Sequence, residues 1–204
     1  MFRINIYLNV KDYFKAIFLN YEKNHIKKKC ANVLKKQSGK KYFEFTSQCR
    51  VAFLYILKYF KEIDPSRNEI IFSAYNLPEM INVAKNLGFK IEFCDIKRDS
   101  GTMDEKILIK KINKRTKAII LTNMFNDFKN SKKIKQIAIK HNIKLIEDNA
   151  IYFDNYSLVE NKKFNSGYLG DYTIYSFNIM KNISALYGGA VTTNDKKFIT
   201  FLNS

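Results

Sequence analysis

The stretch Tyr175–Asp195, "YSFNIMKNISALYGGAVTTND", places a lysine between two short apolar runs. The runs "TIYSF" and "GAVTT" are rich in β-branched and aromatic residues, a composition that predicts two β-strands. The loop between them contains no obvious helix, so we expect an antiparallel pair. Within it, Lys181 lies among apolar residues, which disfavour its charged form and favour a nucleophilic amine. Because the chain is rich in lysine, an ordinary loop lysine is the alternative.

Five further apolar runs precede this pair and alternate with amphipathic segments. The runs are "YFEFT", "EIIFSA", "KIEFCDI", "KAIILTNM" and "IKLIED", and the expected helices lie near residues 50–62, 77–87, 104–113 and 131–141. Strand–helix–strand repetition predicts a three-layer α/β/α fold around a mostly parallel sheet of about seven strands, the last of them antiparallel. Ser131 is the expected cap of the last helix. We expect residues 1–40 to be a helical segment that packs on a domain formed by residues 41–204.

The charge of the chain is strongly positive, with 36 basic and 19 acidic side chains and a net charge of +17. Such a balance favours an anionic partner such as nucleic acid. However, the lysines are spread along the chain together with many isoleucines and asparagines, as an AT-rich genome would also produce, and no zinc-finger or RNP-like pattern accompanies them. We therefore expect no nucleic-acid partner.

The cysteines and the hydrophobic runs bear on location. Cys30, Cys49 and Cys94 are odd in number and irregularly spaced, which predicts reduced thiols and a cytoplasmic protein. No uncharged run of about 18 apolar residues occurs, so no membrane span is expected.

Candidate ligand-binding residues follow the predicted strands, because ligands in open α/β sheets bind at the carboxyl ends of strands. In chain order they are Ser47, Gln48, Cys49, Tyr75, Asn76, Asn123, Asn126, Asp127, Glu147, Asp148, Ser176 and Lys181. Each has an ordinary structural alternative: Asp148 could cap a helix or lie at the surface, Ser47 could be a simple helix cap, and the asparagines could form turns. The two histidines lie in basic segments, and the sequence shows no catalytic Ser/His/Asp set and no metal-ligand cluster.

Considered together, these residues form one chemical set. A helix start after the first strand can bind phosphate, an acid follows the fifth strand, and a serine and then a lysine follow the sixth. Pyridoxal phosphate requires such groups: an amine for its aldehyde, an acid for its ring nitrogen and donors for its phosphate.

From about residue 24 to residue 202 the chain resembles the large domain of the DegT/StrS-type sugar aminotransferases, which are fold-type-I pyridoxal-phosphate enzymes of the aspartate aminotransferase superfamily. The matching stretches are "FTSQCRVAFLYIL", "NEIIFSAYN", "NLGFKIEFCDI", "TKAIILTNMF", "IKLIEDNA", "GYLGDYTIYSFNIMKN" and "YGGAVTTND". The resemblance implies that Lys181 bonds to the cofactor aldehyde and that Asp148 pairs with the ring nitrogen. It also implies that Ser176 and the backbone around Gln48 and Cys49 bind the phosphate.

Several positions depart from the family pattern. The Ser-Gly-Thr turn of the family reads Ser47-Gln48-Cys49, and the aromatic residue that stacks on the cofactor is Leu77 here, unless Tyr75 replaces it. Ile151 stands where the family has Gln or His, and Tyr187 stands where it has Glu.

The resemblance implies an aminotransferase that moves an amino group, usually from glutamate, to a keto sugar attached to a nucleotide, in a homodimer. The family's small C-terminal domain is expected to be missing from this chain. A relic of the family that acts as a binding or interaction protein without turnover is the alternative, and a basic nucleic-acid-binding domain is a third hypothesis.

Overall fold

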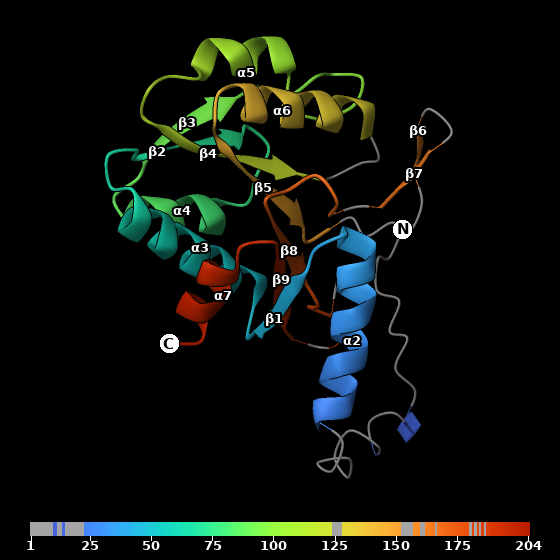
Figure 1. The fold of residues 1–204 in the computed structure, drawn as a ribbon. Coiled ribbons are helices and arrows are strands. Elements are labelled where there is room, and N and C mark those ends of the chain that lie inside the picture. The colour runs from blue at the N-terminus through green and yellow to red at the C-terminus, as the bar shows by residue number, and fades with distance from the viewer. Residues whose placement is uncertain are drawn as a thin grey trace.

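The computed structural model describes residues 10–11, 14, 23–123, 128–151, 157–159, 162–165, 167–179, 181, 183, 185 and 187–204. Within these ranges, seven strands form one sheet in the spatial order β1-β9-β8-β5-β4-β2-β3 (Figure 1). Their bounds are β1 (Tyr42–Thr46), β2 (Glu69–Ser73), β3 (Lys90–Cys94), β4 (Thr116–Thr122), β5 (Lys144–Asn149), β8 (Tyr172–Ser176) and β9 (Gly189–Thr193). A separate antiparallel pair, β6 (Ser157–Val159) and β7 (Lys162–Phe164), was not predicted from the sequence.

The topology confirms the predicted mixed sheet. Strands β8, β5, β4, β2 and β3 are parallel to one another, whereas β9 pairs antiparallel with β8 on one side and with β1 on the other. The sheet is thus parallel except for its last strand. Because β8 and β9 are antiparallel neighbours, the segment that connects them and carries Lys181 leaves and re-enters the sheet at the same end of the strands.

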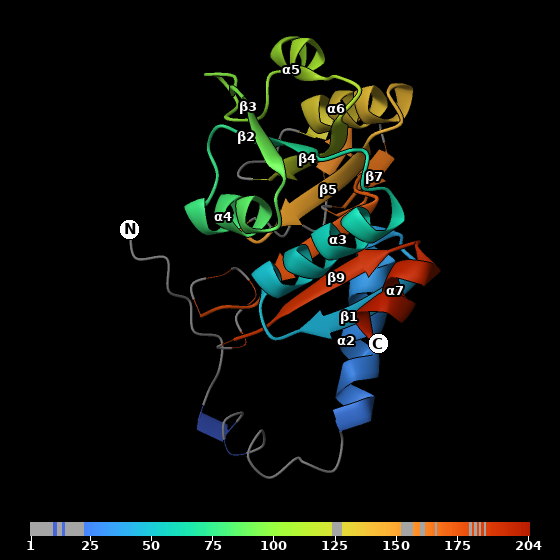
Figure 2. The same cartoon turned by 90° about the vertical axis from the view of Figure 1, so that its left-hand side faces the viewer.

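The helices of the described ranges that surround the sheet are α2 (Lys23–Ser38), α3 (Cys49–Ile63), α4 (Pro78–Asn86), α5 (Glu105–Lys111), α6 (Phe128–Lys140) and α7 (Lys196–Leu202). Helices α5 and α6 lie on one face, and α3, α4 and α7 lie on the other (Figures 1 and 2). Helix α2 packs through Leu34 beside β1 and β9 and occupies part of the segment predicted to be helical. Most of residues 1–22 lie outside the described residues.

The core has two main parts, one on each face of the sheet. Between α3 and the sheet, Phe53, Phe60, Phe72 and Tyr172 are almost fully buried, and each such side chain contributes about 2–3 kcal/mol of hydrophobic stabilisation. On the other face, buried side chains of α5 and α6 pack on β2 and β4. Strand β2 is buried along its whole length, as its continuous apolar run indicates.

The starts of two helices differ from the sequence prediction. Helix α6 begins at Phe128, so the expected cap Ser131 lies inside its first turn and is buried. Helix α7 was not predicted, although it carries an ordinary capping signal. The Asp195 carboxylate accepts from Phe198 N at 3.1 Å and from the Tyr172 hydroxyl at 2.7 Å, which fixes the helix to β8.

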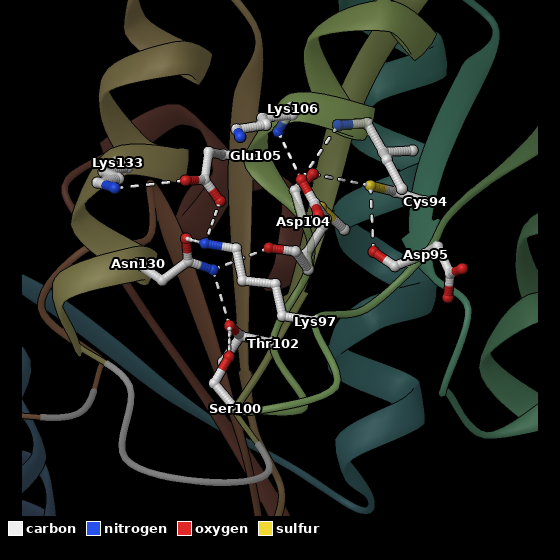
Figure 3. A network of polar contacts seen from close by, with 12 residues as sticks. Cys94, Asp95, Lys97, Ser100, Thr102, Asp104, Glu105, Lys106, Asn130 and Lys133 are labelled. Carbon is white, nitrogen blue, oxygen red and sulfur yellow. Dashed lines mark hydrogen bonds and ion pairs between the residues drawn. The ribbon is translucent and has the colours of Figure 1, made fainter.

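A polar network fixes the segment between β3 and α5 to α6 (Figure 3). The buried Asn130 Nδ2 donates to Thr102 Oγ1 at 2.7 Å and to the Met103 carbonyl at 2.8 Å, while Lys97 Nζ donates to Asn130 Oδ1 at 3.1 Å. Lys97 and Lys133 also form ion pairs with Glu105. The hydrogen bond from Lys97 is the main cause that lowers the pKa of Glu105 to about 2.

None of the helices within the described ranges is both long and apolar enough to cross a membrane.

Candidate active site

One face of the sheet collects polar side chains where β5 and β8 end. Ile146 pairs with Tyr172 and packs in the core under α3, so Asp148, two residues further along β5, points to the same face. Ser176 follows Ile174 by two residues on β8 and shares that face. The structure therefore places the predicted acid and the predicted serine on adjacent strands beneath the start of α3.

The start of α3 rests on the first residue of β9. Gly189 pairs with Thr46 of β1 on one side and with Ser176 of β8 on the other. A Cβ atom on Gly189 would lie 2.3 Å from the Cys49 backbone nitrogen, so only glycine permits this approach. The Gln48 side chain makes no capping hydrogen bond to the helix. The amide groups of the first turn of α3 are thus held next to the strand position of Ser176.

These elements enclose a cavity of about 460 Å³, a volume within the usual range for small-molecule sites. Its lining comes from the starts of α3 and α4, the end of β5 and the connection between β8 and β9. The residues are Gln48, Cys49, Arg50, Leu77, Glu79, Met80, Asp148, Ala150, Ser176, Asn178, Lys181, Tyr187 and Gly188.

Lys181 enters this cavity from a turn in the β8–β9 connection. Its backbone N–H donates to the Asn178 carbonyl at 2.9 Å. Three further backbone bonds among the described residues fix the connection: Ala185 N donates to the Phe177 carbonyl at 2.9 Å, Tyr187 N to the Ala185 carbonyl at 2.8 Å and Phe177 N to the Gly188 carbonyl at 3.0 Å. Lys181 is half-buried and also lines a small neighbouring cavity beside Ile151. Lys181 therefore borders both spaces.

Asp148 is a buried carboxylate whose environment does not fully stabilise its charge. It is 4% exposed, and burial raises its pKa to about 6. Two effects partly oppose this shift: the Ala150 N–H donates to Asp148 Oδ1 at 2.9 Å, and the positive charge of Lys181 lies nearby. A buried carboxylate in this state would gain from a cation placed in the cavity.

Cys49 adds a neutral thiol to the cavity wall. Burial raises its pKa well above the ordinary value, the Asp148 charge adds to the rise, and the charges of Lys181 and Arg50 partly oppose it. The side chain therefore presents a weak S–H donor instead of a thiolate.

Six of the predicted site residues line one cavity, and five other described candidates do not. Gln48, Cys49, Leu77, Asp148, Ser176 and Lys181 lie together. Ser47 and Tyr75 are exposed and outside the lining, and Asn123 is buried elsewhere. The other two of these five are Glu147, which lies in the cluster described below, and Asn76, whose Nδ2 donates to Thr122 Oγ1 at 2.8 Å. Asn126 and Asp127 lie outside the described residues.

Asn123 belongs to a buried cluster on the opposite face of the sheet. Its Nδ2 donates to Glu147 Oε1 at 2.8 Å and to Asn149 Oδ1 at 2.6 Å. The Glu147 carboxylate also accepts from the backbone of Gly167 and Gly170, both at 2.8 Å. This cluster ties β4 and β5 to the segment before β8, so in this structure Asn123 has a structural position instead of one in the cavity.

Some lining residues were missed because they stand inside helix starts and not at strand ends. Arg50 is the second residue of α3, and Glu79 follows Pro78 at the start of α4. The signal that could have found Glu79 is the proline, which is favoured at the first position of a helix and therefore fixes where α4 begins.

Among the residues that the structure describes, no group of three or more His, Cys, Asp or Glu side chains is arranged to hold a metal ion. The cavity instead offers an amine, a buried acid, a helix start and a hydroxyl. The sequence model of the DegT/DnrJ/EryC1/StrS aminotransferase family matches residues 20–202. The chain belongs to this family.

Named relatives are sugar aminotransferases or proteins of polysaccharide biosynthesis. Over 146 residues the chain is 32% identical to the UDP-4-amino-4,6-dideoxy-N-acetyl-beta-L-altrosamine transaminase of Helicobacter pylori, a match that covers 72% of this chain and 38% of the relative. It is 27% identical over 161 residues to the spore coat polysaccharide biosynthesis protein SpsC of Bacillus subtilis, covering 78% of this chain and 39% of SpsC.

Solved structures share the fold. Helicobacter pylori PseC, an aminotransferase involved in the biosynthesis of pseudoaminic acid, superposes with a TM-score of 0.73 at 28% identity, covering 85% of this chain and 45% of PseC. The E. coli GDP-4-keto-6-deoxy-D-mannose-3-dehydratase with bound hydrated PLP superposes with a TM-score of 0.73 at 24% identity, covering 86% of this chain and 45% of that protein, and supports the fold alone. The chain spans less than half the length of these relatives.

Proposed function

We propose that this chain binds pyridoxal phosphate in the cavity beneath α3 and acts as the cofactor-binding part of a sugar-nucleotide aminotransferase. The observation that carries the proposal is that Lys181 and the buried Asp148 line one cavity together with Ser176 and the start of α3. This donor set fits the cofactor group by group.

Asp148 fits the ring nitrogen. When bound, pyridoxal phosphate supplies an aldehyde that reacts with amines and a ring that withdraws electrons. The buried Asp148 carboxylate carries a raised pKa and needs a positive partner, which a protonated ring nitrogen would provide. Pairing would keep Asp148 ionised at neutral pH and would hold the proton on the ring nitrogen.

The start of α3 and Ser176 fit the phosphate. The first turn of a helix presents free N–H groups and the positive end of the helix dipole, which together favour an anion. Gly189 holds the backbone of Gln48 and Cys49 against β9, next to the strand position of Ser176. A hydroxyl and backbone amides can thus donate to the same group.

Lys181 fits the aldehyde and the proton transfer. Its amine would hold the aldehyde end of the cofactor, which supplies the electron-withdrawing chemistry when bound. Lys181 Nζ would also serve as the general base and then as the general acid that moves the substrate proton.

We further propose that glutamate is the amino donor and that a keto sugar nucleotide is the acceptor. The names of the relatives support a sugar substrate. We also propose that residues 41–204 form the cofactor-binding domain, that residues 1–40 pack on it, and that the protein works as a homodimer in the cytoplasm. The described cysteines are all free thiols, as the cytoplasm would keep them.

Borohydride trapping tests the proposal. Purified protein mixed with pyridoxal phosphate should gain an absorbance band in the visible region, and borohydride should fix the cofactor on the peptide that contains Lys181. The Lys181→Ala variant should show neither effect, and its melting temperature in the absence of cofactor should be close to that of the wild type. An unmodified wild-type protein, or equal labelling of the variant, would contradict the proposal.

A second candidate is a binding protein of the same family without turnover. It is favoured by Leu77, which is 48% exposed and offers no aromatic face to a ring, and by the side chains at Gln48 and Cys49 in the phosphate-binding turn. If the visible band forms and glutamate does not bleach it, this candidate replaces the aminotransferase.

A further inference from the structure

Arg50 brings a guanidinium group into the proposed site, at a position that the family resemblance leaves without a role. It is the second residue of α3, directly after Cys49, and it is exposed and lines the cavity. A cation at this place adds to the positive end of the helix dipole, which is an unfavourable arrangement unless an anion lies nearby.

The surroundings of Arg50 do not supply that anion. The first turn of α3 contains no acidic residue. In the described part of the chain, none of the ion pairs involves Arg50. The carboxylates in the described lining of the cavity belong to other elements, Asp148 to the end of β5 and Glu79 to the start of α4. The charge of Arg50 therefore remains available to a ligand.

Position decides which part of a ligand Arg50 would contact. Arg50 stands on the same helix turn as Gln48 and Cys49, and Gly189 joins this turn to the strand position of Ser176. Glu79 and Asp148 would repel a dianion, so the most favourable place for a phosphate in this cavity is the start of α3. The planar fork of an arginine also matches phosphate oxygens.

We propose that Arg50 binds the phosphate group of the cofactor and contributes much of the affinity of this chain for it. The inference rests on the proposed function. It explains how a phosphate could be held by a turn that carries Gln48 and a neutral Cys49 thiol, since a charged donor is added at the next position.

The test compares a ligand that has the phosphate with one that lacks it. Dissociation constants for pyridoxal phosphate and for pyridoxal are measured from the visible band, for the wild type and for Arg50→Ala. Loss of a charged hydrogen bond should weaken pyridoxal phosphate binding by about tenfold or more. Pyridoxal should bind both proteins equally. Arg50→Lys should give an intermediate constant, because it keeps the charge and loses the fork.

Lys58→Ala is the matched control, because Lys58 is an exposed cation of α3 that lies over the Tyr55 ring and outside the cavity lining. It should bind both ligands like the wild type. Equal binding of pyridoxal phosphate by Arg50→Ala and the wild type, or an equal loss for both ligands, would overturn the inference and leave the proposed function standing.

Inorganic phosphate separates the two ideas further. At constant ionic strength it should raise the melting temperature of the wild type more than that of Arg50→Ala. Both proposals would be overturned if the wild type bound neither pyridoxal phosphate nor pyridoxal and if phosphate raised its melting temperature no more than that of Arg50→Ala. A selective gain from phosphate without pyridoxal binding would retain an anion site at Arg50 and would refute the cofactor.

Discussion

The substitution Asp148→Asn should stabilise the protein when no cofactor is bound. The Asp148 pKa is 3.8 in the unfolded chain and about 6 in the fold, so the folded state binds a proton more tightly between these values. Stability conferred by this group therefore falls as the pH rises from about 4 to about 6. The shift of about 2 units corresponds to a penalty of about 3 kcal/mol at pH 8 and of about 1 kcal/mol at pH 4.5.

Asparagine removes the charge and keeps the side-chain oxygen that accepts from Ala150 N. Urea denaturation of the cofactor-free wild type and variant at pH 8 and pH 4.5 measures the two free energies of unfolding. We expect the advantage of the variant to be larger at pH 8 by about 2 kcal/mol. If the advantage is the same at both pH values, or if the variant is the less stable protein at pH 8, Asp148 is not a buried carboxylate in need of a cation.

Pyridoxal phosphate should stabilise the wild type more than the Asp148→Asn variant. The ring nitrogen would supply the missing positive partner in the wild type, whereas the neutral amide of the Asp148→Asn variant could not hold the nitrogen in its protonated form. The cofactor should therefore raise the melting temperature of the wild type by more than that of the variant, and equal shifts would argue against the pairing.

Three other substitutions and one binding measurement have defined outcomes. Gly189→Ala places a methyl group 2.3 Å from the Cys49 nitrogen; it should cost about 1–3 kcal/mol in urea denaturation and weaken pyridoxal phosphate binding, and a variant as stable as the wild type would argue against the close approach. Glu147→Gln replaces one carboxylate oxygen by an amide nitrogen, which cannot accept from the N–H groups of Asn123, Gly167 and Gly170 that surround it. About 1–3 kcal/mol of stability should be lost, and an unchanged urea midpoint would contradict the described cluster. Asn130→Ala removes the hydrogen bonds that Asn130 Nδ2 donates to Thr102 Oγ1 and to the Met103 carbonyl, and it should lower the free energy of unfolding by about 1–3 kcal/mol; no loss would mean that the network does not fix α6. Despite the net charge of +17, duplex DNA should bind weakly at physiological salt, and affinity that persists there would revive the nucleic-acid hypothesis.

Much of the fold could be predicted from local composition. The seven apolar runs became the seven strands of the main sheet, because β-branched and aromatic residues bounded by polar segments are a strong local signal. The short lysine-bearing connection correctly indicated that β9 is antiparallel to β8. Asp148 and Ser176 could be placed in one site because both end parallel strands whose apolar residues alternate in the same register.

Other features depend on geometry that the sequence pattern does not contain. Asn123 and Asp148 both lie near the carboxyl ends of their strands, but Asn123 is on the opposite face of the sheet from Asp148. Successive residues of a strand point to alternate faces, so a difference of one residue in position decides which face a side chain occupies. Arg50 and Glu79 line the cavity because the starts of α3 and α4 border the same space in the fold, and the sequence pattern does not show this arrangement. Strands β6 and β7 are three residues long, too short for alternation to be recognised.

The pairing of β1 with β9 has a consequence for how the protein is made. Strand β1 is among the first parts of the described chain to be synthesised, but it lies at an edge of the sheet and its sheet partner is the last strand. Until Gly189–Thr193 leaves the ribosome, β1 has no neighbour in the sheet, and the start of α3 lacks its close contact with Gly189. Such distant pairings fold slowly, so the nascent chain should depend on chaperones until β9 inserts beside β1.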